Sequence, residues 1–204
     1  MEFDEGLVRM SMMRELEAPG KTTVSEALVS AGISLLLIVG FTLLTTLGAQ
    51  LRIPLPFTPV PVTLQTLMVL LAGAMLGGTR GALSQALYAG WGIAGVPLFA
   101  YGTAGLAVIA GPTGGYIIGF VIAAALVGRL IGQAHTLLAQ VVVFSVGTLA
   151  ILFAGWLHLT LIYTGGDAGR AFVLGVLPFL PGGALKVIAA TAIWRAWSVV
   201  LKGR

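Results

Sequence analysis

The organisation of this chain depends on a glycine-rich passage that runs Tyr88-Ala-Gly-Trp-Gly-Ile-Ala-Gly-Val-Pro-Leu-Phe-Ala-Tyr-Gly102 and continues at Gly111-Pro-Thr-Gly-Gly-Tyr116. Its prolines and glycines prevent one plain spanning helix, and its apolar residues do not suit a solvated loop. Broken backbone at membrane depth is tolerated only where it is buried in protein or lines a cavity. We therefore predict that this passage forms a wall of a solute pocket.

The composition is that of an integral membrane protein. The chain has 204 residues, of which 58% are hydrophobic and 9% are charged, and its mean hydropathy is +1.03. After Glu26 the single acidic residue is Asp167, and the basic residues stand alone between apolar segments. This pattern argues against a nucleic-acid partner, which would need a basic stripe. The absence of cysteine excludes disulfides and thiolate metal sites.

The first 26 residues differ from the rest because they mix acidic and basic side chains around Pro19-Gly20. They lack the basic segment followed directly by an apolar one that marks a cleaved signal peptide. We predict a cytoplasmic N-terminal arm over residues 1–26, a six-helix membrane domain over residues 27–204, and no second domain.

Six segments are predicted to span the membrane, for which a helix needs about 20 apolar residues. They are residues 27–50, 62–78, 82–95, 113–131, 136–163 and 182–200. After the first of them, four prolines in the eight residues 54–61 forbid helix and favour extended backbone. Residues 171–180 are too short to span and are stopped by Pro178 and Pro181, so we predict a re-entrant or interfacial helix there. The predicted fold class is all-α.

The basic residues predict the orientation in the membrane. Six spans put both termini on one side, and the side richer in Lys and Arg faces the cytoplasm. Eight basic residues lie on the side of the termini, and three, Arg52, Arg170 and Lys186, lie on the other. Both termini are therefore predicted to be cytoplasmic. The proline-rich loop, the glycine-rich passage and Pro181-Gly-Gly then converge on the external face as an outward-opening site.

Motifs of the common catalytic and nucleotide sites are absent from the sequence. There is no Gly-x-x-x-x-Gly-Lys-Ser/Thr phosphate loop, no His-Glu-x-x-His zinc site and no Gly-x-Ser-x-Gly nucleophile. His135 is predicted to be a surface residue, and His158 to pack between helices, because a lone histidine gives no metal site. We therefore predict that the chain is not an enzyme and holds no metal or cofactor.

Lys186 is the most informative single residue, because it lies four residues into the last predicted span. An ionisable residue inside a span is a functional hypothesis by default, although a lysine near a helix end can also extend its ammonium group to the interface. The orientation rule disfavours lysine at the external end, which favours a functional role. Apart from Asp167 no acidic residue is near, so its partner is predicted to be an anion from outside, aided by a helix start at Gly182.

Aromatic and polar side chains flank the same external segments. The aromatic residues are Phe57, Tyr88, Trp91, Phe99, Tyr101 and Tyr116, and the amide and hydroxyl residues are Thr58, Thr63, Gln65, Thr103 and Thr113. Any one of these residues taken singly is more readily explained by a structural role than by contact with a ligand. Together with Lys186 they predict a pocket for a small, largely apolar solute that carries one carboxylate and a compact hydrogen-bonding head.

Four linked motifs stand in order along residues 39–200. They are Ile53-Pro-Leu-Pro-Phe-Thr-Pro-Val-Pro-Val-Thr-Leu-Gln65, Gly95-Val-Pro-Leu-Phe99, Gly111-Pro-Thr-Gly-Gly-Tyr116, and Pro178-Phe-Leu-Pro-Gly182 with Lys186. In this combination the sequence resembles the BioY family, the biotin-specific substrate-binding (S) components of energy-coupling-factor transporters.

The resemblance implies a six-helix S-component fold in a bacterial inner or plasma membrane, surrounded by membrane lipids, with biotin bound near the external surface as the transported ligand. It also implies a transmembrane coupling protein and two ATPase subunits as partners, which supply the energy. The substrate-binding residues expected from motif and resemblance are Gln65, Tyr88, Phe99, Tyr101, Thr113, Gly115, Tyr116 and Lys186. Tyr101 stands where the family often has a polar side chain.

Gly183 departs from the family pattern, which usually reads Pro-Gly-Asp-x-x-Lys. The glycine removes an acceptor and a charge partner for Lys186. One transport alternative therefore stays open, the same fold with a related small carboxylate vitamin. The resemblance leaves a second one open, a biotin transporter that works without a dedicated module. Two other classes compete with transport. An intramembrane enzyme lacks a nucleophile–base pair, and a purely structural subunit would hold no small molecule.

Overall fold

The structure is a computed structural model that describes residues 24–202. The predicted arm over residues 1–26 therefore lies almost entirely outside the described residues. The chain divides into two compact units, Met1–Leu35 and Leu36–Arg204, and the boundary falls within helix α2 (Val24–Gln50). In the described part of the first unit, the Ser34 hydroxyl donates to the Ser30 carbonyl at 2.8 Å.

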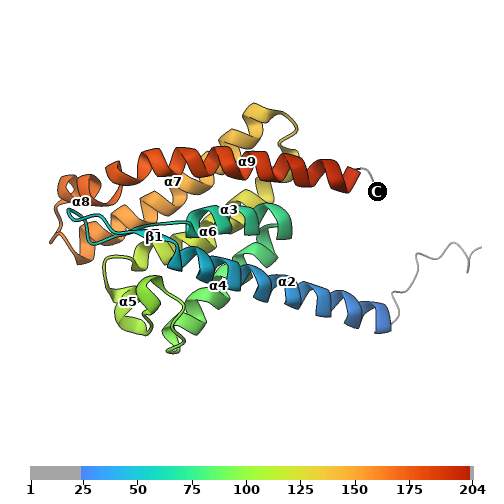
Figure 1. Ribbon diagram of the computed structural model, residues 1–204, viewed down its shortest axis with the longest axis horizontal. Helices are drawn as coiled ribbons and strands as arrows, with labels where there is room; N and C mark the ends of the chain where they lie inside the picture. The colour runs from blue at the N-terminus through green and yellow to red at the C-terminus, as the bar shows by residue number, and fades with distance from the viewer. Residues whose placement is uncertain (1–23, 203–204) are drawn as a thin grey trace, which may run out of the picture. The chain divides into compact units, whose positions relative to one another are not determined.

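The second unit is helical, as predicted. Beyond α2 it contains α3 (Gln65–Leu76), α4 (Gly78–Ile93), α5 (Leu106–Ala110), α6 (Gly114–Leu130), α7 (Leu137–Ile162), α8 (Ala168–Gly175) and α9 (Leu180–Lys202) (Figure 1). Short 3-10 helices lie between them, namely η1 (Ala100–Gly102), η2 (Ile131–Gln133) and η3 (Leu177–Phe179). A helix occupies each segment that the sequence predicted to span, so the positions of the helices are confirmed.

Helix length distinguishes two of these segments from the others. In residues 24–202, four stretches are long and apolar enough to cross a membrane: Val24–Gln50, Gly114–Gln133, Leu137–Ile162 and Ala168–Val200. Helices α3 and α4 have 12 and 16 residues. At 1.5 Å per residue they extend about 18 and 24 Å, less than the roughly 30 Å of a hydrocarbon core. The total of six spans therefore remains a prediction.

The proline-rich loop is extended, as predicted, and its ends form the antiparallel pair β1 (Arg52–Ile53) and β2 (Val62–Thr63). Because β2 is paired with β1, the helix predicted from residue 62 begins only at Gln65. The Leu64 amide donates to the Gly48 carbonyl of α2 at 3.1 Å. A Cβ at Gly48 would lie 3.0 Å from the Gln65 nitrogen, so glycine permits this approach. Within the described residues this pair is the one departure from an all-α fold.

The start of α9 differs from the prediction. Pro181 does not stop a helix but lies in the first turn of α9, which begins at Leu180 rather than Gly182. Proline is tolerated in a first turn because the amides there have no acceptor within the helix. The preceding short helix, α8, begins at Ala168 because the Asp167 carboxylate caps it and accepts from the Arg170 amide at 2.8 Å. Asp167 is thus the N-terminal capping residue of α8.

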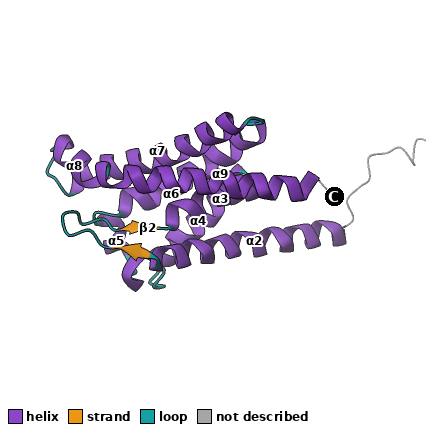
Figure 2. Ribbon diagram, turned by 45° about the horizontal axis from the view of Figure 1, so that its top comes forward, coloured by secondary structure: helices purple, strands orange, loops and turns teal. Residues whose placement is uncertain are grey.

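Small residues allow close packing between α3 and α6. A Cβ at Gly73 would lie 2.5 Å from the Ala124 carbonyl oxygen, so only glycine fits there. Gly77 instead has φ +82 and turns the chain between α3 and α4. Figures 1 and 2 both place the strand pair, α5 and α8 at the same end of the helices of this unit. The irregular segments are therefore gathered where the candidate site lies.

Candidate functional site

The gathered segments and the helices beneath them enclose a cavity of about 280 Å³. The proline-rich loop, the glycine-rich passage and the first turns of α9 each contribute to its lining, so their predicted convergence is confirmed. The larger apolar and aromatic lining residues are Val60, Tyr88, Phe99, Val108, Tyr116, Ile117, Phe120, Ile151, Leu152 and Phe179. The polar ones include Thr63, Gln65, Thr66, Tyr101, Thr103, Thr113, Thr148 and Lys186.

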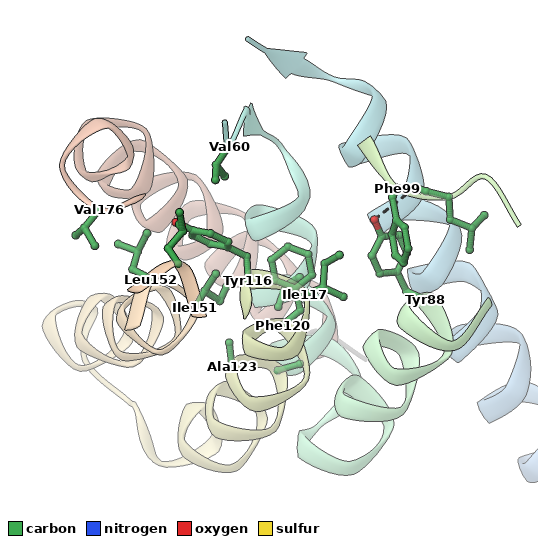
Figure 3. Packing of buried hydrophobic residues seen from close by; sticks show 14 of the residues in the cluster. Val60, Tyr88, Phe99, Tyr116, Ile117, Phe120, Ala123, Ile151, Leu152 and Val176 are labelled. Atoms are coloured by element: carbon green, nitrogen blue, oxygen red, sulfur yellow. Dashed lines mark hydrogen bonds between the residues drawn. The ribbon is translucent and has the colours of Figure 1, made fainter. Parts of the chain in front are cut away.

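The rings of Tyr88, Phe99 and Phe120 form an aromatic wall in the cavity lining, and Figure 3 shows these side chains in the buried cluster. The Tyr88 and Phe99 rings meet edge to face, with centroids 5.4 Å apart and an interplanar angle of 76°, a favourable geometry for ring quadrupoles. The Phe120 ring lies 6.4 Å from Tyr88. Gly92, one turn after Tyr88 on α4, makes this wall possible, because a Cβ there would overlap the Phe99 ring.

A chain of hydrogen bonds holds the polar groups behind this wall. The Gln65 side-chain amide donates to the Tyr88 hydroxyl oxygen at 2.6 Å, and the Tyr88 hydroxyl donates to the Leu98 carbonyl at 3.4 Å. The Thr63 hydroxyl donates to Gln65 Oε1 at 3.1 Å. Gln65 and Tyr88 therefore tie α3, α4 and the residue before Phe99 together. Their polar atoms are largely satisfied within the protein.

Tyr116 lines the cavity from α6. Its hydroxyl donates to the Gly175 carbonyl at the end of α8 at 2.7 Å, and its ring centroid lies 6.0 Å from that of Phe179. Gly155 of α7 leaves room for the ring, since a Cβ there would overlap it. Tyr116 thus links α6 to the segment that leads into α9.

Gly115 is absent from the lining, unlike the other residues predicted for the site. Its Cα faces α7, where an added Cβ would overlap His158 and the Ala154 carbonyl oxygen. His158 Nε2 lies 2.9 Å from the Gly111 carbonyl oxygen, in keeping with its predicted packing role. Gly115 therefore allows α6 and α7 to pack closely. From the same turn, Thr113 lines the cavity.

Tyr101 forms part of the cavity rim, because it lines the cavity and is still 51% exposed. Its φ of 65° is the only positive value of a residue other than glycine in the described chain. The Arg52 guanidinium carbon lies 4.1 Å from the ring centroid, within the range of a cation–π interaction. The rim thus joins β1 to η1.

Lys186 is half-buried in the second turn of α9 and lines the cavity. Among residues 24–202 its ammonium group has no hydrogen-bond or ion-pair partner, and no other lysine or arginine lines the cavity. Gly183 lies one turn earlier on the same lining, where a Cβ would come within 3.3 Å of Thr148 Cγ2. The cavity therefore offers one cation and no carboxylate.

Seven of the eight predicted site residues therefore surround one cavity. Phe57 and Trp91 do not line it, and Thr58 instead donates to the Leu174 carbonyl at 2.7 Å.

The sequence-based prediction missed Thr66 and the α7 residues Thr148, Ile151 and Leu152, which also line the cavity. Thr66 is notable because its buried hydroxyl has no partner among the described residues. In that part of the chain, no three His, Asp or Glu side chains are placed to hold a metal ion.

Comparison with known proteins gives consistent matches. The model of the BioY family matches residues 21–202. A probable biotin transporter BioY of Pyrococcus horikoshii is 41% identical over 157 residues, which cover 77% of this chain and 90% of that protein. The biotin transporter BioY of Thermotoga maritima is 35% identical over 166 residues, covering 81% of this chain and 92% of that protein.

A solved structure has a similar fold. It is the crystal structure of the S-component for biotin from an ECF-type ABC transporter, with a TM-score of 0.75 and 25% sequence identity. The match covers 83% of this chain and 92% of that one. The likeness therefore extends over most of both chains.

Proposed function

The chain belongs to the BioY family, and from this premise we propose that it binds biotin in the described cavity and carries it across a membrane. It is a membrane protein of a transporter family and not an enzyme. The observation that carries the proposal is an apolar cavity with a single cation, Lys186, in its lining. Biotin combines a compact bicyclic ring with one carboxylate, which matches that lining.

The size and chemistry of the cavity support a ligand of this kind. Its volume of about 280 Å³ is close to the lower end of the roughly 300–1,000 Å³ of small-molecule sites. The rings of Phe99 and Phe120 and the side chain of Ile151 offer apolar surface to the bicyclic ring and the alkyl chain. Lys186 supplies the charge that the carboxylate needs once it leaves water.

We assign the remaining predicted residues supporting parts. Tyr101 and Thr113 present their side chains to the ligand at the rim. Gln65, Tyr88 and Tyr116 shape the wall, because their polar atoms are engaged with the protein. Phe99 contributes its ring.

The membrane arrangement is part of the same proposal. Residues 27–204 form a six-span domain in the bacterial plasma membrane, with α3 and α4 as short spans beside the longer helices. Both termini are cytoplasmic, and the cavity opens to the outside. Eight basic residues against three on the opposite side support this orientation.

Partners supply the energy for transport. We propose a transmembrane coupling protein and two ATPase subunits, because this sequence contains no phosphate loop of its own. The name of the solved S component, which describes it as part of an ECF-type ABC transporter, supports this assembly.

Biotin retention by the purified protein tests the proposal. Lys186→Met keeps the alkyl length and removes the charge, and breaking a buried charge pair costs roughly 2–5 kcal/mol. The expected result is a loss of biotin affinity of at least about thirtyfold, with much less loss for biotin methyl ester. Arg195→Met, at an exposed cation of the same helix outside the cavity, is the matched control. Wild-type protein that retains no biotin would refute the proposal.

A second candidate ligand is a related small carboxylate vitamin, which Gly183 favours because it leaves the lining without a carboxylate beside Lys186. Competition for the bound ligand decides between the two. Biotin and a panel of other carboxylate vitamins are added to the same preparation. Displacement by another vitamin at lower concentration than by biotin would establish the second candidate.

A further inference from the structure

Arg52 is a cation outside the cavity lining that contacts the lining through another residue. Its guanidinium lies over the Tyr101 ring at 4.1 Å. It also donates to the carbonyl and side-chain oxygens of Gln50, at 3.3 and 3.4 Å. Gln50 in turn donates from its side-chain amide to the Phe99 carbonyl at 3.2 Å. These contacts run from Phe99 through Gln50 and Arg52 to Tyr101, and the backbone through Ala100 closes the ring. The ring connects the end of α2 and β1 to η1.

The backbone of Tyr101 shows that its position is imposed. A φ of 65° puts a bulky side chain in the left-handed region, which L residues other than glycine adopt only when their surroundings enforce it. Glycine follows directly at position 102 with the same φ. The Phe99 amide closes the η1 turn by donating to the Thr103 carbonyl at 3.1 Å. Arg52 is the charged group that contacts the strained residue.

Because Tyr101 lies at the rim of the cavity, the contacts that hold it affect access to the cavity. The side chain is half exposed and also lines the cavity, so it lies between the cavity and the solvent. Gly95 and Gly105, on either side of η1, both have positive φ, and an added Cβ at either would meet nothing within 4 Å. The amides of both glycines donate to the Gly92 carbonyl, at 3.3 and 2.7 Å, but among residues 24–202 no side chain packs against either end of the segment. The contact with Arg52 therefore restrains it from outside.

We propose that Arg52 is a positioning residue that holds Tyr101 across the rim of the cavity and so sets how long the ligand stays bound. This inference rests on the proposed function for the identity of the ligand. The position of the Tyr101 side chain at the rim does not depend on that function. A positioning role for Arg52 differs from that of a charge that attracts the anionic ligand from a distance. Long-range attraction raises the association rate and is screened by salt, whereas a restraint on the rim lowers the dissociation rate.

Separate measurement of the two rates tests the proposal on the purified full chain. Arg52→Met is expected to accelerate biotin dissociation roughly three- to thirtyfold, the range of one cation–π contact, with an association rate that changes less than about twofold. Arg52→Lys keeps a cation for the ring and should restore much of the slow dissociation. Arg170→Met, at an exposed cation, should leave both rates as in the wild type.

The double variant separates the contact from other effects. Tyr101→Gly relieves the backbone strain and removes the ring, so it should also accelerate dissociation. Adding Arg52→Met to it should change the rate little further, because Arg52 then has no ring to hold. Independent, multiplicative effects would overturn the proposal. So would an Arg52→Met variant whose only defect is a slower, salt-dependent association.

A ligand-independent measurement distinguishes this inference from the proposed function. The sequence contains no cysteine, so Thr148→Cys places a single thiol in the buried lining. Its modification by a small methanethiosulfonate should be faster when Arg52→Met is added. Equal rates with and without Arg52→Met would overturn the inference even if the wild type binds biotin. Faster modification would support it even if biotin is not the ligand.

Discussion

At the scale of single residues, the aromatic wall of the cavity depends on the missing side chain of Gly92. A Cβ at this position would overlap the Phe99 ring, and Phe99 is almost fully buried against Tyr88. Gly92→Ala should therefore lower the free energy of unfolding by about 1–3 kcal/mol, the usual cost of overpacking. It should also weaken ligand binding, because Phe99 must move toward the cavity. Thermal unfolding in detergent and a binding isotherm measure the two effects.

Gly90 is the matched control for this prediction. It lies on the same helix, and a Cβ there would meet nothing within 4 Å. Gly90→Ala should leave binding unchanged and raise helix stability by up to about 1 kcal/mol, because alanine is the better helix former. If Gly92→Ala behaved as Gly90→Ala does, the assigned role of Gly92 would be wrong.

Single residues also show why part of the site could be read from the sequence. Tyr88, Phe99, Tyr101 and Lys186 were found because each is an unusual residue beside a break in an apolar run. Thr66 and Thr148 could not be found in the same way. Thr66 lies in the first turn of α3 and Thr148 in the middle of α7. Which side of an apolar helix faces a cavity is decided by packing.

At the scale of elements, α8 is short and begins at a single capping residue. The Asp167 carboxylate accepts from the Arg170 amide at 2.8 Å, and the Gly175 carbonyl at the other end accepts from the Tyr116 hydroxyl at 2.7 Å. Asp167→Ala should destabilise the helix by about 1 kcal/mol. Amide hydrogen exchange over residues 168–175 should then accelerate roughly fivefold. Asp167→Asn retains a capping oxygen and should exchange nearly as the wild type does.

The limits of sequence prediction also differ between elements. The helix α7 was predicted to within one residue at each end, because its apolar run is long and lacks charge. The start of α3 was misplaced because Val62 and Thr63 pair with residues about ten positions earlier, an interaction that local periodicity does not contain. Pro181 was read as a stop although a first helical turn accepts proline equally well.

At the scale of the whole molecule, the convergence of three distant segments followed from orientation rather than from any local pattern. The alternation of six predicted spans put the proline-rich loop, the glycine-rich passage and the start of the last span on one face, and the count of basic residues assigned that face to the outside. All three contribute to the cavity lining. Gly115 belongs to one of these segments yet faces α7, because the count specifies a side of the membrane and not the direction of a side chain.

The proposed assembly makes a prediction about energy. A binding protein alone can bring its ligand only to equilibrium, and this sequence has no phosphate loop with which to use ATP. Cells that lack coupling modules and produce this chain should therefore retain a single biotin per chain without accumulating the free vitamin. Co-production of the coupling protein and both ATPases should add concentrative uptake. Replacing the phosphate-loop lysine of the ATPases should abolish that uptake and leave the bound fraction unchanged, because the cavity lies in this chain. Accumulation of free biotin by this chain alone would instead establish a solitary transporter.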